Sequence, residues 1–218
     1  MNKNIIALTG VHRAGKDTVA VLLKELLGGE ENVEIKSFAE PIQKAVASLL
    51  GVTLEKVKSH PYKDSPSGIV SYAVGENPFS NLKEAQEFQK RLSEEGYDLK
   101  FKEYEITPRD LVIEIAEGLK DAFGDGIWAN IAFSKMSPDK TTIFTDLRFK
   151  SELKELKIRN VKLIKIVLLD KEGKKVKGDE YQMSYLPDNE FDYILYNEGN
   201  NLEELKQEVL TMIEKLKL

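Results

Sequence analysis

The segment 10–16, Gly-Val-His-Arg-Ala-Gly-Lys, restricts the fold of this chain more than any other feature. The apolar run 4–9 before it predicts a buried strand, and apolar residues at helical spacing over 17–27 predict a helix after it. A glycine-rich turn at such a junction lets several backbone N–H groups converge, and the helix N-terminus adds partial positive charge. We therefore expect the loop to bind phosphates, with Lys16 reaching the outer ones. An ordinary glycine turn with a surface lysine is the alternative.

The residue after the lysine departs from the general pattern, which has serine or threonine there as a magnesium ligand. Here Asp17 takes that place and Thr18 follows. Asp17 either serves the metal through water or stabilises the loop and helix start, and we favour the second role. Arg13 either reaches the triphosphate or lies over the rim of the loop. The residues expected to bind ATP phosphates are Gly10, Arg13, Ala14, Gly15, Lys16, Asp17 and Thr18.

Strands alternate with helices along the rest of the chain. Further strands are expected over 33–38, 141–145, 161–169 and 192–196, and helices over 41–50, 107–123, 128–136, 151–158 and from about 200 to the C-terminus. This alternation predicts an α/β fold with a five-stranded parallel sheet flanked by helices in three layers. We expect one domain over 1–218.

The segment 59–105 interrupts this rhythm. It contains several prolines and glycines, followed by a polar helix expected to begin near Asn81. We interpret it as a helical insertion that contributes to an acceptor site, because it is too short and polar to bury much apolar surface alone. Its part from 68 to 78 is a candidate for a segment that closes over the site.

An acid and a base follow the predicted strand 141–145. Asp146 and Arg148 would lie at the carboxyl end of a parallel strand, where open α/β sheets bind ligands. Asp146 is expected to hold magnesium or its waters, and Arg148 to bind a phosphate. Glu152, four residues further on, is placed to orient Arg148. A solvated turn with an ordinary ion pair is the alternative.

Two other residues are candidates for an acceptor site. Arg109 lies in the first turn of a helix that Thr107 caps and Pro108 begins, so it either binds an acceptor phosphate or is a surface arginine. Trp128, the single tryptophan, either stacks on a base or packs in the core.

The composition excludes some classes of protein. The net charge of -5 argues against binding long nucleic acid, although a mononucleotide needs only a local cluster of cations. Cysteine is absent, which excludes disulfides and fits a reducing compartment. No apolar run is long enough for a membrane span, and the N-terminus lacks the features of a signal peptide. We expect a cytoplasmic protein, in the host cytoplasm if viral, with no membrane partner. Whether it forms a homodimer stays open.

The order of these motifs resembles that of the bacteriophage-type deoxynucleoside monophosphate kinases, a branch of the P-loop nucleoside monophosphate kinases. The resemblance covers nearly the whole chain. It fails over 59–105, and the stretch 182–185 is shorter than its counterpart. Ala14 also replaces a commoner serine. The similar segments are the loop with its Asp-Thr, the stretch from Phe38 to Ala45, Arg109-Asp-Leu, Trp128, Thr145-Asp-Leu-Arg148 with Glu152, and the tail from Asp192.

The resemblance implies a P-loop kinase fold and magnesium-dependent transfer of the ATP γ-phosphoryl group to a deoxynucleoside monophosphate. Its catalytic residues would be Lys16, Arg148, Asp146 and Arg13, and magnesium would be held by Asp17, Thr18 or Asp146. The acceptor nucleotide would be bound by Phe38, Arg109, Trp128, Arg148 and Glu152. Two rivals remain. One is a kinase of the same fold acting on dephospho-coenzyme A or phosphomevalonate, and the other is a nucleotide-dependent switch that transfers no phosphate.

Overall fold

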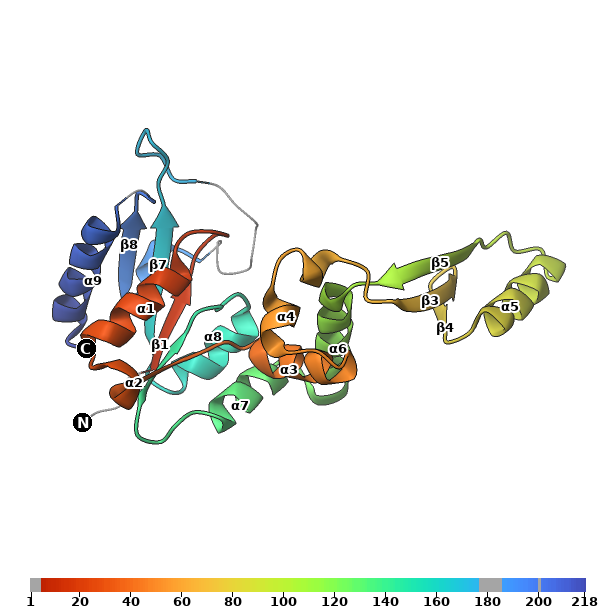
Figure 1. Ribbon diagram of the computed structural model, residues 1–218, viewed down its shortest axis with the longest axis horizontal. Coiled ribbons are helices and arrows are strands. Elements are labelled where there is room, and N and C mark those ends of the chain that lie inside the picture. The colour runs from red at the N-terminus through yellow and green to blue at the C-terminus, as the bar shows by residue number, and fades with distance from the viewer. Residues whose placement is uncertain (1–4, 177–185, 200) are drawn as a thin grey trace. The chain divides into compact units, whose positions relative to one another are not determined.

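The computed structural model describes residues 5–176, 186–199 and 201–218 (Figure 1). The chain divides into two compact units. The first consists of Met1–Pro41 and Leu119–Leu218, and the second of Ile42–Gly118. The stretch 182–185, which is shorter than its counterpart in the family that the sequence resembles, lies outside the described residues.

A five-stranded parallel sheet forms the centre of the first unit (Figure 1). Its first strand along the chain, β1, lies in the middle of the sheet. The chain therefore places its next strands on one side of β1 and its last strands on the other side. In such sheets the point of reversal is where ligands bind. The order from edge to edge is β2 (Val33–Lys36), β6 (Thr141–Phe144), β1 (Ile5–Thr9), β7 (Lys162–Leu168) and β8 (Tyr193–Asn197).

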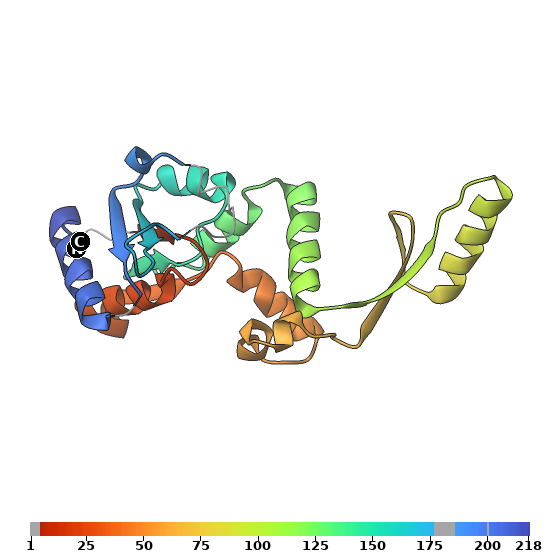
Figure 2. The ribbon, with the colours of Figure 1, turned by 90° about the horizontal axis from the view of Figure 1, so that it is seen from above.

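Helices cover both faces of this sheet (Figure 2). Buried residues of α1 (Lys16–Leu26) and α9 (Leu202–Leu216) share one core with the sheet, and those of α7 (Ile127–Ser134) and α8 (Lys150–Lys157) share the other. A short helix, α2 (Gly29–Asn32), precedes β2. The expected three-layer α/β fold is therefore confirmed.

The continuous apolar character of the strands follows from these two cores. Ile6 and Leu8 of β1 face the core beneath α1 and α9, whereas Ala7 between them belongs to the opposite core. Alternate residues of a strand point to opposite faces, so a strand covered on both sides needs apolar residues at every position. All five expected strands are present, with ends shifted by at most two residues, and β2 was expected from its alternation of apolar and charged residues.

The second unit contains helices packed on a small core and a separate antiparallel sheet. The core lies between α3 (Glu40–Leu49), which starts in the first unit, α4 (Leu54–Lys58) and α6 (Pro108–Phe123), which ends in it. The expected cap of α6 is confirmed, because the Thr107 hydroxyl accepts a hydrogen bond from the Asp110 N–H and the Asp110 carboxylate accepts one from the Thr107 N–H. The sheet has the order β4 (Asn77–Phe79), β3 (Ile69–Val74) and β5 (Phe101–Ile106), and α5 (Leu82–Glu94) packs on it.

The expectation of a helical insertion over 59–105 is only partly correct. The polar helix is present, and the Asn81 side chain caps it by accepting a hydrogen bond from the Glu84 N–H. The three strands were not expected. Four of the six residues of β5 are exposed, so this strand lacks the apolar alternation by which a half-buried strand is recognised. The segment 68–78 contains β3 and all but the last residue of β4, and these two strands form a hairpin.

None of the helices within the described residues combines the length and the apolar character needed to cross a membrane.

Candidate phosphate-binding site

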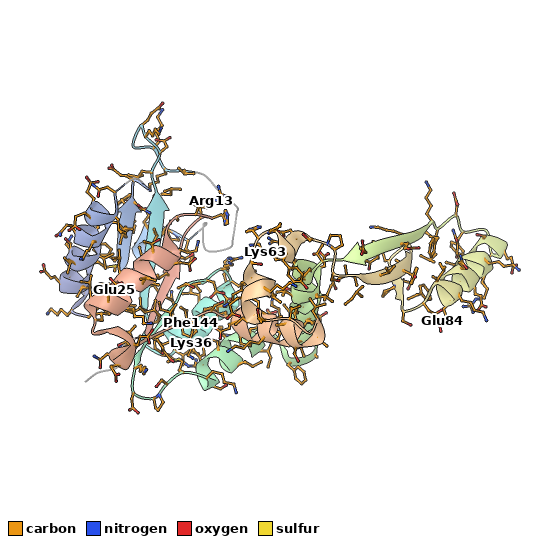
Figure 3. All side chains as sticks on the ribbon, in the orientation of Figure 1. Arg13, Glu25, Lys36, Lys63, Glu84 and Phe144 are labelled. Carbon is orange, nitrogen blue, oxygen red and sulfur yellow. The ribbon has the colours of Figure 1, made fainter. Side chains whose placement is uncertain are left out.

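The loop 10–15 joins the carboxyl end of β1 to the N-terminus of α1. Two of its residues have left-handed backbone conformations, Arg13 with φ 61° and Gly15 with φ 92°. The Ala14 N–H donates a hydrogen bond of 3.2 Å to the Val11 carbonyl, which curls the loop. The exposed Arg13 side chain projects outward from it (Figure 3).

The Lys16 side chain lies over this curled backbone. Its Nζ donates hydrogen bonds of 2.9 Å to the carbonyl oxygens of Gly10 and Val11. Burial lowers the pKa of Lys16 from its usual 10.5, and the positive charge of Arg148 lowers it further, whereas Asp17 and Asp146 oppose this shift. The ammonium is thus held at the loop, within electrostatic range of all three charged residues.

Both glycines of the motif are required by close packing. A Cβ at Gly10 would lie 2.5 Å from the Ile166 carbonyl oxygen of β7, and a Cβ at Gly15 would lie 2.6 Å from Asn197 Nδ2. The left-handed conformation of Gly15 is a second reason for glycine there. Ala14 between them is fully buried, so its side chain packs in the core and only its backbone is available to a phosphate.

Asn197, the last residue of β8, holds the loop from the side. Its Nδ2 donates a buried hydrogen bond of 2.9 Å to the Ala14 carbonyl, and its Oδ1 accepts one of 2.9 Å from the Gly199 N–H. The side chain is buried, with both of its polar atoms hydrogen-bonded.

The Asp146 carboxylate is fixed by the turn that follows β2. Its Oδ2 accepts hydrogen bonds from the Ser37 hydroxyl at 2.6 Å and from the Ala39 N–H at 3.1 Å, and its Oδ1 accepts one from the Phe38 N–H at 2.8 Å. This pairing is possible because β6 lies between β2 and β1 in the sheet. Asp146 is thereby held at the end of β6, beside the loop that leaves β1.

Glu152 supports the same region from the start of α8. Its Oε2 accepts hydrogen bonds of 2.8 and 3.0 Å from the backbone N–H groups of Arg148 and Phe149, which caps the helix. Burial raises the pKa of Glu152 to about 7, and the negative charge of Asp146 raises it as well. Glu152 therefore orients the backbone around Arg148. Arg148 itself is exposed to solvent.

The first turn of α1 offers oxygen atoms for a metal ion. Asp17 and Thr18 are exposed, and within the described residues neither side chain makes a hydrogen bond, so the proposed loop-stabilising bonds of Asp17 are not observed. Magnesium prefers oxygen ligands and is often held by one or two carboxylates together with substrate phosphates. Asp17, Thr18 and Asp146 fit such an ion chemically. The described residues contain no cluster of three or more histidine or acidic side chains that would hold a metal without phosphates.

Two residues expected to contact the acceptor nucleotide lie in the protein core. Phe38 is 2% exposed and stacks on Phe144 with ring centroids 4.4 Å apart. Trp128 is 7% exposed on α7. Neither ring presents a face on which a base could stack. Trp128 therefore packs in the core, which was the alternative to base stacking. Phe38 contributes its backbone N–H, which donates a hydrogen bond to Asp146.

Arg109 belongs to the second unit, where it forms part of a charged cluster. Its Nε donates a hydrogen bond of 2.5 Å to Asp64 Oδ1, and His60 Nδ1 lies 3.0 Å from Asp64 Oδ2. The hydrogen bond from Arg109 lowers the pKa of Asp64. Arg109 therefore has a carboxylate partner that the sequence did not indicate.

The sequence also did not identify Ser37 and Asn197 as parts of the site. Both are polar residues at the carboxyl end of a strand of the parallel sheet, which is the position where open sheets place ligand-binding groups. That position is the signal in the sequence by which both residues could have been identified.

No protein-family model matches the chain, and no curated protein matches it.

Proposed function

We propose that this protein transfers the γ-phosphoryl group of ATP to a deoxynucleoside 5'-monophosphate, forming the diphosphate and ADP. The observation that carries the proposal is the curled loop at the end of β1 with the Lys16 ammonium held over its backbone and the Asp146 carboxylate fixed beside it. A cation, a curled glycine-containing loop and a fixed carboxylate at the carboxyl ends of neighbouring parallel strands are suited to binding a triphosphate with its metal. The choice of acceptor rests on the resemblance in motif order.

The chain's own groups would act mainly by positioning and by neutralising charge. The Lys16 side chain would exchange its bonds to the loop carbonyls for bonds to the outer phosphates, and Arg148 would bind the phosphoryl group in transfer. The Ser37 hydroxyl and the neighbouring N–H groups would keep Asp146 oriented. Magnesium, when bound with the triphosphate, supplies additional charge neutralisation and fixes the phosphate geometry.

The proposal is tested by measuring ADP formation against each deoxynucleoside monophosphate, with ribonucleotides, dephospho-coenzyme A and phosphomevalonate in parallel. Acceptor-stimulated ADP formation with a deoxynucleotide supports it. Stimulation only by dephospho-coenzyme A or phosphomevalonate would transfer the assignment to that kinase. ATP binding with slow hydrolysis and no stimulation would instead indicate a switch protein.

A matched pair of lysine variants separates chemistry from stability. Lys16→Ala should lower turnover by roughly 10²–10³-fold, as expected for loss of one preorganised charge-stabilising donor. Lys24→Ala lies on the same helix, where Lys24 pairs with Glu30 at 2.6 Å, and should leave turnover unchanged. Near-normal turnover in a folded Lys16→Ala protein would contradict the proposed site.

A further inference from the structure

The contact between Asn197 and the loop joins residues 183 positions apart in the sequence. Asn197 ends β8, an edge strand of the parallel sheet, and its backbone carbonyl accepts a hydrogen bond of 2.8 Å from the Leu169 N–H. The residue is thus anchored through its backbone while its side chain reaches the loop. The Asn197 side chain makes a buried hydrogen bond to one particular backbone carbonyl. An aliphatic side chain at this position could not make that bond.

The Ala14 carbonyl that Asn197 holds belongs to the same peptide unit as the Gly15 N–H. In a trans peptide these two groups point in opposite directions, and the unit is rigid. Fixing the carbonyl towards Asn197 therefore directs the Gly15 N–H away from Asn197. Within the described residues, that N–H donates to no other protein group.

Gly15 itself is in close contact with the same side chain. Because a Cβ there would lie 2.6 Å from Asn197 Nδ2, the amide occupies the space that any other residue would need. The position of Asn197 thus accounts for one glycine of the motif. It also limits sideways movement of the backbone at the junction with α1.

We propose that Asn197 is a positioning residue of the phosphate loop. By holding the Ala14 carbonyl, it presets the direction of the Gly15 N–H and so raises the affinity of the loop for a triphosphate. This inference deepens the proposed function and rests on it, because it assumes that the loop binds phosphates. Asn197 acts through the loop backbone and is not assigned contact with the nucleotide.

The test measures binding of inorganic tripolyphosphate by calorimetry, because this probe reports on the phosphate cradle without a base or sugar. Asn197→Ala should weaken binding about tenfold or more, the scale expected when a buried hydrogen-bond partner is removed. Asn201→Ala is the matched control. Asn201 caps α9 by accepting hydrogen bonds from the Glu203 and Glu204 N–H groups, so its loss should lower the melting temperature and leave tripolyphosphate affinity unchanged.

A second variant distinguishes positioning from general loss of structure. Asn197→Asp has nearly the same shape, but its ionised carboxylate cannot donate to the Ala14 carbonyl. Its protonated carboxyl can donate, so tripolyphosphate affinity of this variant, relative to the original protein, should recover as the pH is lowered through the pKa of the introduced acid. Asn197→Ala introduces no acid and should show no such relative recovery.

The outcomes separate this inference from the proposed function. If the original protein does not bind tripolyphosphate, the phosphate loop itself is wrongly assigned. If the original protein binds it and folded Asn197→Ala binds it equally well, only the positioning role is overturned. Asn197→Asp affinity that stays parallel to that of the original protein at every pH would overturn it too.

Discussion

The Asp146 carboxylate accepts a hydrogen bond of 2.6 Å from the Ser37 hydroxyl, which connects the ends of β6 and β2. Two backbone N–H groups, those of Phe38 and Ala39, complete the set of donors around it. Three converging donors match a carboxylate and no neutral side chain of the same shape. The turn after β2 is therefore built around the charge of Asp146.

Asp146→Asn should consequently destabilise the first unit as well as slow turnover. The introduced NH₂ group must face donors on at least one side, which leaves polar groups unsatisfied and should cost about 1–3 kcal/mol of unfolding free energy. Urea unfolding followed by circular dichroism measures this. Ser37→Ala removes only one of the three donors and should have the smaller effect. A larger loss for Ser37→Ala would show that the carboxylate does not organise the turn.

Glu152 should make stability depend on pH. Its pKa in the folded protein is about 7, above its usual 4.5, so between these values the folded state holds more protons than the unfolded state. The free energy of unfolding should therefore decrease as the pH rises through this window. At about 1.4 kcal/mol per unit, the difference is of the order of 3 kcal/mol.

Glu152→Gln should remove this decrease, because a glutamine oxygen can still accept the N–H bonds and has no proton to lose. Urea unfolding at several pH values from 4.5 to 8 compares the two proteins. Glu25→Gln, at an exposed position on α1, serves as the control and should follow the original protein (Figure 3). Parallel curves for all three proteins would contradict the raised pKa.

Gly10→Ala should strongly destabilise the fold. The added Cβ would meet the Ile166 carbonyl at 2.5 Å, and this oxygen is backbone of the neighbouring strand, so it cannot move aside cheaply. We expect a loss of roughly 2–4 kcal/mol. Gly118→Ala is the matched control, since it lies within α6 with no atom within 4 Å of the added Cβ, and should stabilise by about 0.5–1 kcal/mol. Thermal unfolding of both variants compares them, and equal melting temperatures would refute the steric argument.

Trp128 should report on the core of the first unit and should not stack on a bound base. Because its side chain is 7% exposed, its fluorescence should be blue-shifted, weakly quenched by acrylamide, and red-shifted on unfolding. Titration with a deoxynucleoside monophosphate should quench it no more than titration with deoxyribose 5-phosphate. Strong quenching by the nucleotide alone would restore the stacking role.

The sequence by itself determined the elements whose signals are local. The strand and helix that flank the loop 10–15, and the other strands of the parallel sheet, follow from residue spacing within single segments. Most of these strands are apolar runs, since burial on both faces demands apolar residues, whereas β2 is recognised by its alternation of apolar and charged residues. The cap of α6 and the start of α5 near Asn81 were also predicted, because the signals of a helix start lie within a few consecutive residues.

Only the tertiary structure decided which distant residues complete the site. Ser37 reaches Asp146 and Asn197 reaches Ala14 because of the order of strands in the sheet, and the spacing within any one segment contains no information on that order. The burial of Phe38 and Trp128 likewise depends on what packs against their elements. The strands of the second unit were not predicted for a related reason. Exposed strands are stabilised by pairing with neighbouring strands, and this pairing cannot be recognised from the composition of one segment.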